Sequence, residues 1–270
     1  MKLKIAICFF GITRSLSYTV DSIVNNIISD AEKVGEVKKF GHFFAQKEIR
    51  NARSNEFVEL DVEEYKLLDF DHIEIEKPEL FLDGSDFELV KSYGDGWGDN
   101  FNSVRNLFHQ LYSLDRVTSA ALDWDPDITI FVRPDLHYHD RFLNSIKFAN
   151  QSIIPTVFLP SWQHWLGGYN DRFAICAHRH AIIAYGSRYH SILDFCERNQ
   201  CPLHSELLLR HALNKSNLRV KFFNIKATRV RANGESNNES FIPYYLDNIY
   251  RVPKKFLADM VSPLVKVIRK

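Results

Sequence analysis

The hydrophobic positions along the chain fall into short apolar runs separated by segments with helical spacing. Residues 3–10 form the first apolar run, which stops at Gly11, and apolar residues then recur at helical spacing from Val20 to Ile28. This pattern predicts a strand followed by a helix over residues 17–33. Comparable runs predict further strands at 37–45, 72–76, 128–132, 153–159, 218–223 and 227–231.

Helical spacing predicts a long amphipathic helix that begins near Phe101, and two more helices over 178–198 and 203–214. Strands that alternate with helices in this way predict an α/β fold, with a mostly parallel, doubly wound central sheet flanked by helices. Residues 47–70 are charged and weakly patterned, and are interpreted as an insertion or a small helix. Residues 83–99 are rich in glycine and aspartate, and both a lid and a flexible connection fit them.

The composition narrows the classes of protein that fit. With 270 residues, 45% of them hydrophobic, the chain is long enough for one large α/β domain. The formal net charge is zero, so nucleic acid is not expected as a partner. The four cysteines are scattered without CxxC spacing, which argues against zinc ribbons and disulfide frameworks. Since no stretch approaches the ~20 apolar residues of a membrane span, we expect a cytoplasmic protein.

The C-terminal segment differs in pattern from the rest of the chain. Basic residues there alternate with apolar residues such as Leu264 and Ile268, although Pro263 interrupts the helical spacing. We therefore expect a globular domain over residues 1–250, followed by a basic amphipathic helix over 251–270. Such a helix either makes peripheral membrane contact or packs on the domain.

The densest group of candidate functional residues follows the predicted strand at 128–132. Arg133, Asp135, His137, His139 and Asp140 come directly after it. In open α/β sheets, ligands bind outside the carboxyl ends of the strands, so a binding site is expected here. If the backbone stays extended, Asp135, His137 and His139 point to one side, where they could hold a divalent metal. Ordinary turn chemistry is the competing interpretation.

A second candidate is the segment Gly11-Ile12-Thr13-Arg14, which follows the first predicted strand. In a doubly wound sheet this first turn binds phosphate, because helix N-terminal amides and a basic side chain meet there. Only one glycine is present, so the segment satisfies neither a Rossmann fingerprint nor a P-loop. Arg14 is expected either to contact a diphosphate or base, or to pair with a core carboxylate.

Two acidic residues in the second half of the chain are further candidates. Asp171 follows a loop with paired glycines, which allow close backbone approach to a ligand. It either hydrogen-bonds to that ligand or caps the next element. Glu206 lies in the first turn of a predicted helix, where the macrodipole favours a carboxylate. Ser205 or His204 is expected to cap that helix.

Taken in order, these features resemble the GT-A-type glycosyltransferases of bacterial and viral surface-polysaccharide synthesis. The motifs that carry the resemblance are a strand ending in Gly-x-x-Arg, a strand ending in Arg-Pro-Asp-Leu, and Gly-Gly-Tyr-Asn-Asp-Arg-Phe, within residues 3–231. The resemblance implies a GT-A-like (Rossmann-like) fold with the nucleotide on its N-terminal half. The residues implied at the donor site are Gly11, Arg14, Arg133 and Arg231. Arg229 and Arg231 then either close over the diphosphate leaving group or form a solvated strand face.

The resemblance also implies a metal and a catalytic base. GT-A enzymes hold a divalent cation against the diphosphate with an Asp-x-Asp motif, and Asp135-Leu136-His137 occupies that place here. The histidine favours Mn²⁺, because Mg²⁺ is a hard cation that prefers oxygen ligands, whereas Mn²⁺ tolerates imidazole better. In a metal-free enzyme, Arg14 and Arg133 would neutralise the diphosphate instead. The implied base is Glu206 first and Asp171 second, and it deprotonates the acceptor hydroxyl.

The expected function is therefore transfer of a sugar from a nucleoside-diphosphate sugar to a hydroxyl of a surface glycan or lipid-linked acceptor. One alternative is a catalytically inactive module that binds a nucleotide or glycan on the same scaffold, which the histidine at position 137 keeps open. A weaker alternative is a metal-dependent hydrolase that uses Asp135, His137 and His139, because no further ligand cluster stands out at a recognisable spacing.

Overall fold

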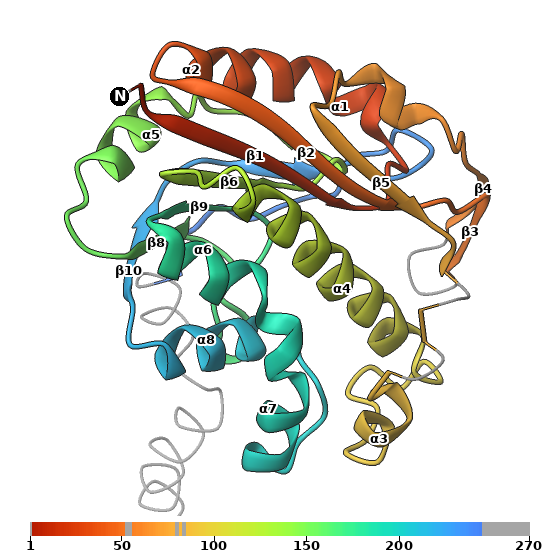
Figure 1. Cartoon of the computed structure of the whole chain (residues 1–270). Helices are drawn as coiled ribbons and strands as arrows, with labels where there is room; N and C mark the ends of the chain where they lie inside the picture. The colour runs from red at the N-terminus through yellow and green to blue at the C-terminus, as the bar shows by residue number, and fades with distance from the viewer. Residues whose placement is uncertain (1, 52–55, 79–80, 83–84, 245–270) are drawn as a thin grey trace, which may run out of the picture.

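A seven-stranded, mostly parallel sheet runs through the protein, with helices on both of its faces (Figure 1). The computed structural model describes residues 2–51, 56–78, 81–82 and 85–244. The strand order is β10-β8-β9-β6-β1-β2-β5, and only β9 runs antiparallel to its neighbours. The strands are β1 (Lys4–Gly11), β2 (Glu36–Phe44), β5 (His72–Glu76), β6 (Ile128–Val132), β8 (Thr156–Pro160), β9 (Ala174–Ala177) and β10 (Arg219–Phe223).

Two short antiparallel pairs lie outside this sheet. The strand β7 (Leu136–Tyr138) pairs with β11 (Ala227–Arg229), and β3 (Glu48–Asn51) pairs with β4 (Glu56–Glu59). The pairing of β7 with β11 matters for function, because it brings the end of the described chain back to the segment that follows β6.

The helices form two layers, one above and one below the sheet as drawn in Figure 1. On one face lie α1 (Leu16–Ile23), a π-helical segment (Val24–Ile28), α2 (Ser29–Glu32) and α5 (Leu143–Asn150). On the other lie α4 (Asn102–Leu122), α6 (Arg179–Gly186) and α8 (Ser205–Lys215), with α3 (Phe87–Lys91) and α7 (Ile192–Asn199) packed beyond them. Short 3₁₀ turns are Glu64–Leu67, Trp165–Gly167 and Arg188–Ser191.

The first strand shows why its sequence is an uninterrupted apolar run. Ile5, Ile7 and Phe9 pack toward α1 and α5, whereas the alternate residues Ala6 and Cys8 pack toward α4 and α6. A central parallel strand is covered on both faces, so every position in it must be apolar. The predicted α/β class, with a mostly parallel sheet between helices, is confirmed.

Several predicted boundaries are wrong in detail. Residues 47–70 form an insertion between β2 and β5, as one of the two predicted alternatives has it, but its β3–β4 hairpin was not predicted. Strands of four residues are too short to give a clear period. The predicted loop 83–99 contains α3. The helix predicted over 178–198 is divided into α6 and α7, since a 3₁₀ turn interrupts it.

The other predicted strands and helices are found close to their predicted positions. The strand predicted at 153–159 begins at Thr156, where pairing with β10 starts, and Ile153 is 92% exposed. The predicted helix over 251–270 lies outside the described residues.

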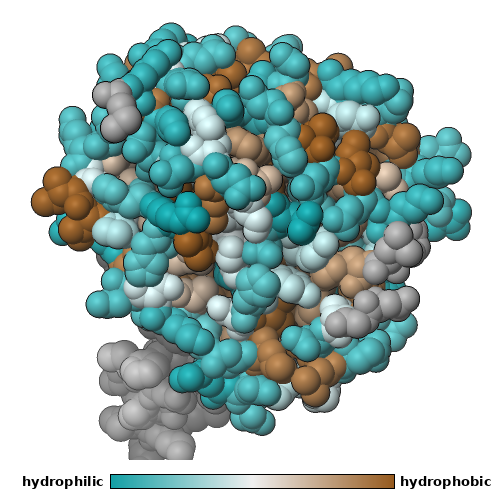
Figure 2. Space-filling model, in the orientation of Figure 1, coloured by the Kyte–Doolittle hydropathy of each residue, from teal (hydrophilic) through white to brown (hydrophobic). Residues whose placement is uncertain are grey.

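No helix among the described residues is long and apolar enough to cross a membrane. The face shown in Figure 2 is mostly hydrophilic, and its hydrophobic patches are separated by hydrophilic side chains. The described residues on this face therefore offer no continuous apolar surface.

Candidate functional site

The chain changes direction across the sheet between β1 and β6. From β1 it continues through α1 and α2 to β2 on one side, whereas from β6 it continues through β7 and α5 to β8 on the other. The two strands are neighbours, with Phe9 opposite Val132. This is a topological switch point, the place where open α/β sheets bind ligands. It brings together the two segments singled out from the sequence, Gly11–Arg14 and Arg133–Asp135.

Asp135 lies at the centre of the switch point and is 3% exposed. Arg14 Nη2 lies 2.6 Å from its Oδ2, and Arg133 binds both carboxylate oxygens, at 2.9 and 2.8 Å. Arg229 Nε lies 4.0 Å from the same Oδ2. Burial alone would raise the pKa of Asp135, but Arg133, Arg14 and Arg229 hold it well below its usual range. Asp135 is therefore an anion that holds three guanidinium groups together.

A second buried carboxylate extends this cluster. Glu56 is 2% exposed and lies 2.9 Å from Arg231 Nη1 and 3.7 Å from Arg14 Nη1. Arg231 Nε also donates to Asn237. We call Arg14, Arg133, Arg229 and Arg231, with Asp135 and Glu56, the arginine cluster.

The arginine cluster has more cationic groups than its carboxylates satisfy, because four arginines face two acids. Within the described residues, the buried Nε atoms of Arg14 and Arg229 have no hydrogen-bond partner. Burial, and then the charge of Arg133, lower the pKa of Arg229 to about 9, so it still carries its charge at neutral pH. Unpaired guanidinium donors in a partly buried site are suited to bind an anion such as phosphate.

Gly11 contributes backbone geometry to this site. Its φ of +102° is a conformation that residues with a Cβ rarely adopt, and its N–H donates to Ser113 Oγ of α4 at 2.8 Å. That N–H is already used within the protein, so Gly11 shapes the turn that presents Arg14.

The loop before β9 holds the start of α8 in place. The backbone N–H of Tyr169 donates to the carbonyl oxygen of Glu206 at 3.0 Å. A Cβ on Gly168 would lie 2.3 Å from the carbonyl carbon of Glu206. The close approach predicted for the paired glycines is therefore made to the backbone of Glu206, whereas a ligand was expected there. The glycine fixes where the Glu206 side chain begins.

Glu206 and Asp171, the two predicted acid–base candidates, interact electrostatically in this loop region. Burial, and then the negative charge of Asp171, raise the pKa of Glu206 to about 8. His204 Nδ1 lies 3.3 Å from Glu206 Oε2, and the ring of His204 stacks on Trp97. Glu206 therefore holds its proton at neutral pH and releases it just above.

Asp171 is bound by groups of the protein itself. Ser205 Oγ donates to Asp171 Oδ2, and Arg188 Nη2 lies 3.9 Å from the same atom. The prediction that Ser205 or His204 caps α8 is wrong: His204 occupies the N-cap position without a capping side-chain bond, and Ser205 is directed to Asp171. Asp171 also raises the pKa of Arg133, which links the arginine cluster to Glu206 and Asp171 in one charged site.

The raised pKa of Glu206 gives a prediction about stability. In the unfolded chain a glutamate ionises near its ordinary pKa of about 4.3. Between that value and about 8 the folded protein retains a proton that the unfolded chain has lost, so the free energy of unfolding falls as pH rises through this range. The glutamine in Glu206→Gln cannot ionise. We therefore expect the free energy of unfolding of this variant to fall less between these pH values than that of the wild type, by about 1–3 kcal/mol. Urea unfolding near pH 5 and near pH 9 measures the difference, and the exposed residue Glu197, as Glu197→Gln, is the control that should follow the wild type.

His137 lies in β7, which pairs with β11. It pairs with Thr228 across β7 and β11, and its ring packs 5.1 Å from that of His139, whose Nε2 lies 2.7 Å from Thr228 Oγ1. Both oxygens of Asp135 are engaged by guanidinium groups, an arrangement that disfavours the expected Mn²⁺ site at Asp135 and His137.

A different group of described residues could hold a metal ion. One ligand atom from each of His42, Glu74 and Glu76 lies within 4.8 Å of the other two. Sequence reasoning missed this group, although the alternation in His72-Ile73-Glu74-Ile75-Glu76 places both glutamates on one face of a strand. What the sequence did not show was that β5 lies beside β2.

A small hollow of about 10 Å³, room for about one water molecule, lies next to the turn after β1. Thr13 from that turn, Phe44 and Gln46 from the end of β2, and Tyr65 are among the residues that line it. Its aromatic and polar walls adjoin the segment that carries Arg14. The sequence gives no sign of it, because its walls come from four separate segments.

The sequence matches no model of a known protein family, and no curated protein matches it either.

Proposed function

We propose that the protein is a GT-A-type glycosyltransferase, which moves a sugar from a nucleoside-diphosphate sugar to a hydroxyl of a glycan or lipid-linked acceptor. The observation that carries this proposal is the arginine cluster at the switch point of the sheet, with buried guanidinium nitrogens of Arg14 and Arg229 that lack an acceptor. A diphosphate supplies the oxygens that these donors lack.

In this proposal the arginines take the part that a metal plays in related chemistry. Arg14, Arg133 and Arg229 neutralise the diphosphate and stabilise the charge that develops on it as the bond to the sugar breaks. Asp135 positions the guanidinium groups. Since its oxygens are already bound by arginine, no step is assigned to a metal at Asp135 and His137.

The hollow beside the turn after β1 has room for about one water molecule, so in this proposal its walls move apart to take the nucleobase. A base needs an aromatic or apolar surface to stack on and a few polar groups at its edge. Phe44 and Tyr65 supply the first, while Thr13 and Gln46 supply the second. Because Thr13 directly precedes Arg14, a nucleotide with its base in the hollow has its phosphates directed toward the arginine cluster.

Glu206 is assigned as the base that activates the acceptor. A general base works best with a pKa near the working pH, and burial together with Asp171 gives Glu206 a pKa of about 8. Glu206 takes the proton from the acceptor hydroxyl while the oxygen of that hydroxyl forms a bond to the sugar carbon. The bond from that carbon to the diphosphate breaks, and the nucleoside diphosphate leaves with the electron pair.

The alternative of a catalytically inactive module is favoured by one observation. Asp135, which takes the place of the metal-binding Asp of the GT-A motif, is fully engaged by Arg14 and Arg133. A protein that binds a nucleotide or glycan without turnover would show the same contacts.

A thermal-shift panel tests the proposal. Purified protein is heated with UDP-, GDP-, CMP- and dTDP-sugars, each with EDTA and with Mn²⁺. We expect one nucleotide class to raise the midpoint with EDTA as well as with Mn²⁺, because a ligand in excess stabilises the fold it binds. Arg229→Met should weaken this binding at least about tenfold, while the exposed control Arg219→Met keeps it.

Stabilisation that survives in Arg229→Met, or no stabilisation by any nucleotide, would contradict the proposed donor site. Stabilisation only with Mn²⁺ would contradict the role given to the arginines. The two function classes separate in a second step: the transferase releases nucleoside diphosphate from the stabilising donor when an acceptor is present, and the inactive module does not.

A further inference from the structure

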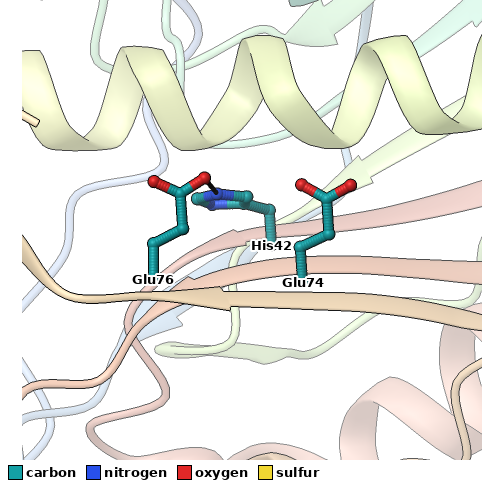
Figure 3. Close-up of side chains that lie close together, drawn as sticks. All are labelled: His42, Glu74 and Glu76. Atoms are coloured by element: carbon teal, nitrogen blue, oxygen red, sulfur yellow. Dashed lines mark hydrogen bonds and ion pairs between the residues drawn. The ribbon is translucent and has the colours of Figure 1, made fainter.

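We propose that His42, Glu74 and Glu76 form a binding site for one divalent transition-metal ion, separate from the proposed donor site. The three side chains project from neighbouring strands toward α4, with the imidazole between the two carboxylates (Figure 3). This site does not depend on the function proposed above.

Strand pairing explains why the three side chains meet. In β5, Glu74 and Glu76 are two residues apart and therefore lie on the same face. In the parallel register His42 is opposite Glu74, and Phe44 is opposite Glu76. His42 is 1% exposed, whereas the side chains of Glu74 and Glu76 are 31% and 33% exposed. One nitrogen and two carboxylate oxygens thus converge at the edge of a buried layer.

The hydrogen bonds of Ser113 determine which nitrogen of His42 carries the proton. Ser113 Oγ donates its single proton to the carbonyl oxygen of His42 at 2.7 Å, and it accepts the N–H of Gly11 at 2.8 Å. His42 Nδ1 lies 3.0 Å from the same Oγ, which has no further proton to give. With the Ser113 proton on that carbonyl oxygen, His42 donates from Nδ1.

The consequence concerns the other ring nitrogen, Nε2, which faces Glu76. In the neutral ring with its proton on Nδ1, Nε2 presents a lone pair, and Nε2 lies 3.2 Å from Glu76 Oε1. A lone pair facing a carboxylate is repulsive without a cation between or beside them. A metal ion bound to Nε2 and to the glutamates removes that repulsion.

The surroundings match those of metal-binding histidines. Such a histidine usually donates its second ring N–H to a neighbouring group that fixes its orientation, as His42 does to Ser113. A neutral imidazole with two carboxylates suits Zn²⁺ or Mn²⁺, and leaves a coordination position open. Mg²⁺ is a poorer match, since it prefers oxygen ligands throughout.

Arg116 is the charged competitor for this position, and Tyr112 and His72 also contact Glu76 and Glu74. Arg116 Nη2 lies 2.8 Å from Glu74 Oε2, and Arg116 Nε lies 3.8 Å from Glu76 Oε1. The arginine side chain is 42% exposed, so it can move into solvent when a metal binds. Arg116 balances the glutamates without metal, and its removal should therefore strengthen metal binding.

Calorimetric titration of the EDTA-treated, full-length protein with ZnCl₂ tests the proposal. We expect one Zn²⁺ per chain, with at least about tenfold weaker binding in His42→Gln and in Glu76→Gln. Arg116→Gln should bind Zn²⁺ several-fold more tightly, a gain that a misfolded variant would not show. His180→Gln, which changes an exposed histidine of α6, is the matched control and should bind as the wild type does.

Three results would overturn the site: no stoichiometric Zn²⁺ binding by the wild type, equal binding by His42→Gln, or no gain in Arg116→Gln. Each would contradict a metal ion held jointly by His42, Glu74 and Glu76. None of these results bears on nucleotide binding, so the proposed donor site is tested independently of the metal site.

Discussion

Replacing Asp135 with asparagine is expected to lower the free energy of unfolding by about 3–5 kcal/mol. The change removes the one anion that Arg14, Arg133 and Arg229 share, and leaves three guanidinium groups facing one another at the switch point. Removing one partner from a buried ion pair is costly, because the other charges stay desolvated without compensation. Urea unfolding of the variant and the wild type measures the loss.

A matched control distinguishes this effect from the general cost of losing a buried aspartate. Asp30 is 0% exposed and is bound by Arg141 and Lys33. It lies in α2, away from the switch point, so Asp30→Asn should also destabilise the protein. Only Asp135→Asn should be stabilised more strongly by pyrophosphate than the wild type, since an anion can take the place of the lost carboxylate. Equal responses of the two variants to pyrophosphate would contradict an anion site in the arginine cluster.

Replacing Glu206 with glutamine is expected to lower turnover about 10²–10⁴-fold, the usual contribution of a positioned general base. Glutamine keeps the shape of the side chain but cannot take a proton. In the wild type, turnover should rise with pH toward about 8, because the ionised form of Glu206 is the base. Release of nucleoside diphosphate from the donor, followed across this pH range, measures both effects.

Donor binding serves as the internal control for this variant. Glu206→Gln should bind the nucleotide as tightly as the wild type does, because the arginine cluster is unchanged. Glu197→Gln, on the exposed face of α7, should keep both binding and turnover. Turnover that survives in Glu206→Gln, with its pH dependence intact, would assign the base to Asp171, the second candidate.

The architecture could be read from the sequence to the extent that it depends on local patterns. A central strand covered on both faces is almost entirely apolar, and Ile128–Val132, with Thr129 as its one polar residue, was located to the residue for that reason. The short strand Ala174–Ala177 was not recognised, and nothing in four apolar residues shows that it runs antiparallel between two parallel strands.

The candidate site was also predicted only in part: some of its residues could be identified from the sequence, but their contacts could not. Arg14, Asp135, Asp171 and Glu206 were found because polar side chains at strand ends and helix starts stand out along the chain. The residues that they pair with could not be predicted, because the partners are far apart along the chain. Arg14 and Asp135 are separated by 121 residues, and Arg231 and Glu56 by 175. The sequence predicted a metal beside Asp135 and left open that Arg14 pairs with a core carboxylate. The fold showed that Asp135 is that carboxylate, and that Arg133 and Arg229 also lie beside it.

A crystal structure of the protein with the nucleoside diphosphate of the stabilising class tests the central claim most directly. The claim places the two phosphates against the guanidinium groups of Arg14 and Arg229, within about 3 Å of their nitrogens, and the base in the hollow beside Thr13. Density for the diphosphate there would confirm the donor site. Density for the nucleotide elsewhere on the protein, or a crystal grown with excess nucleotide that shows none, would contradict it.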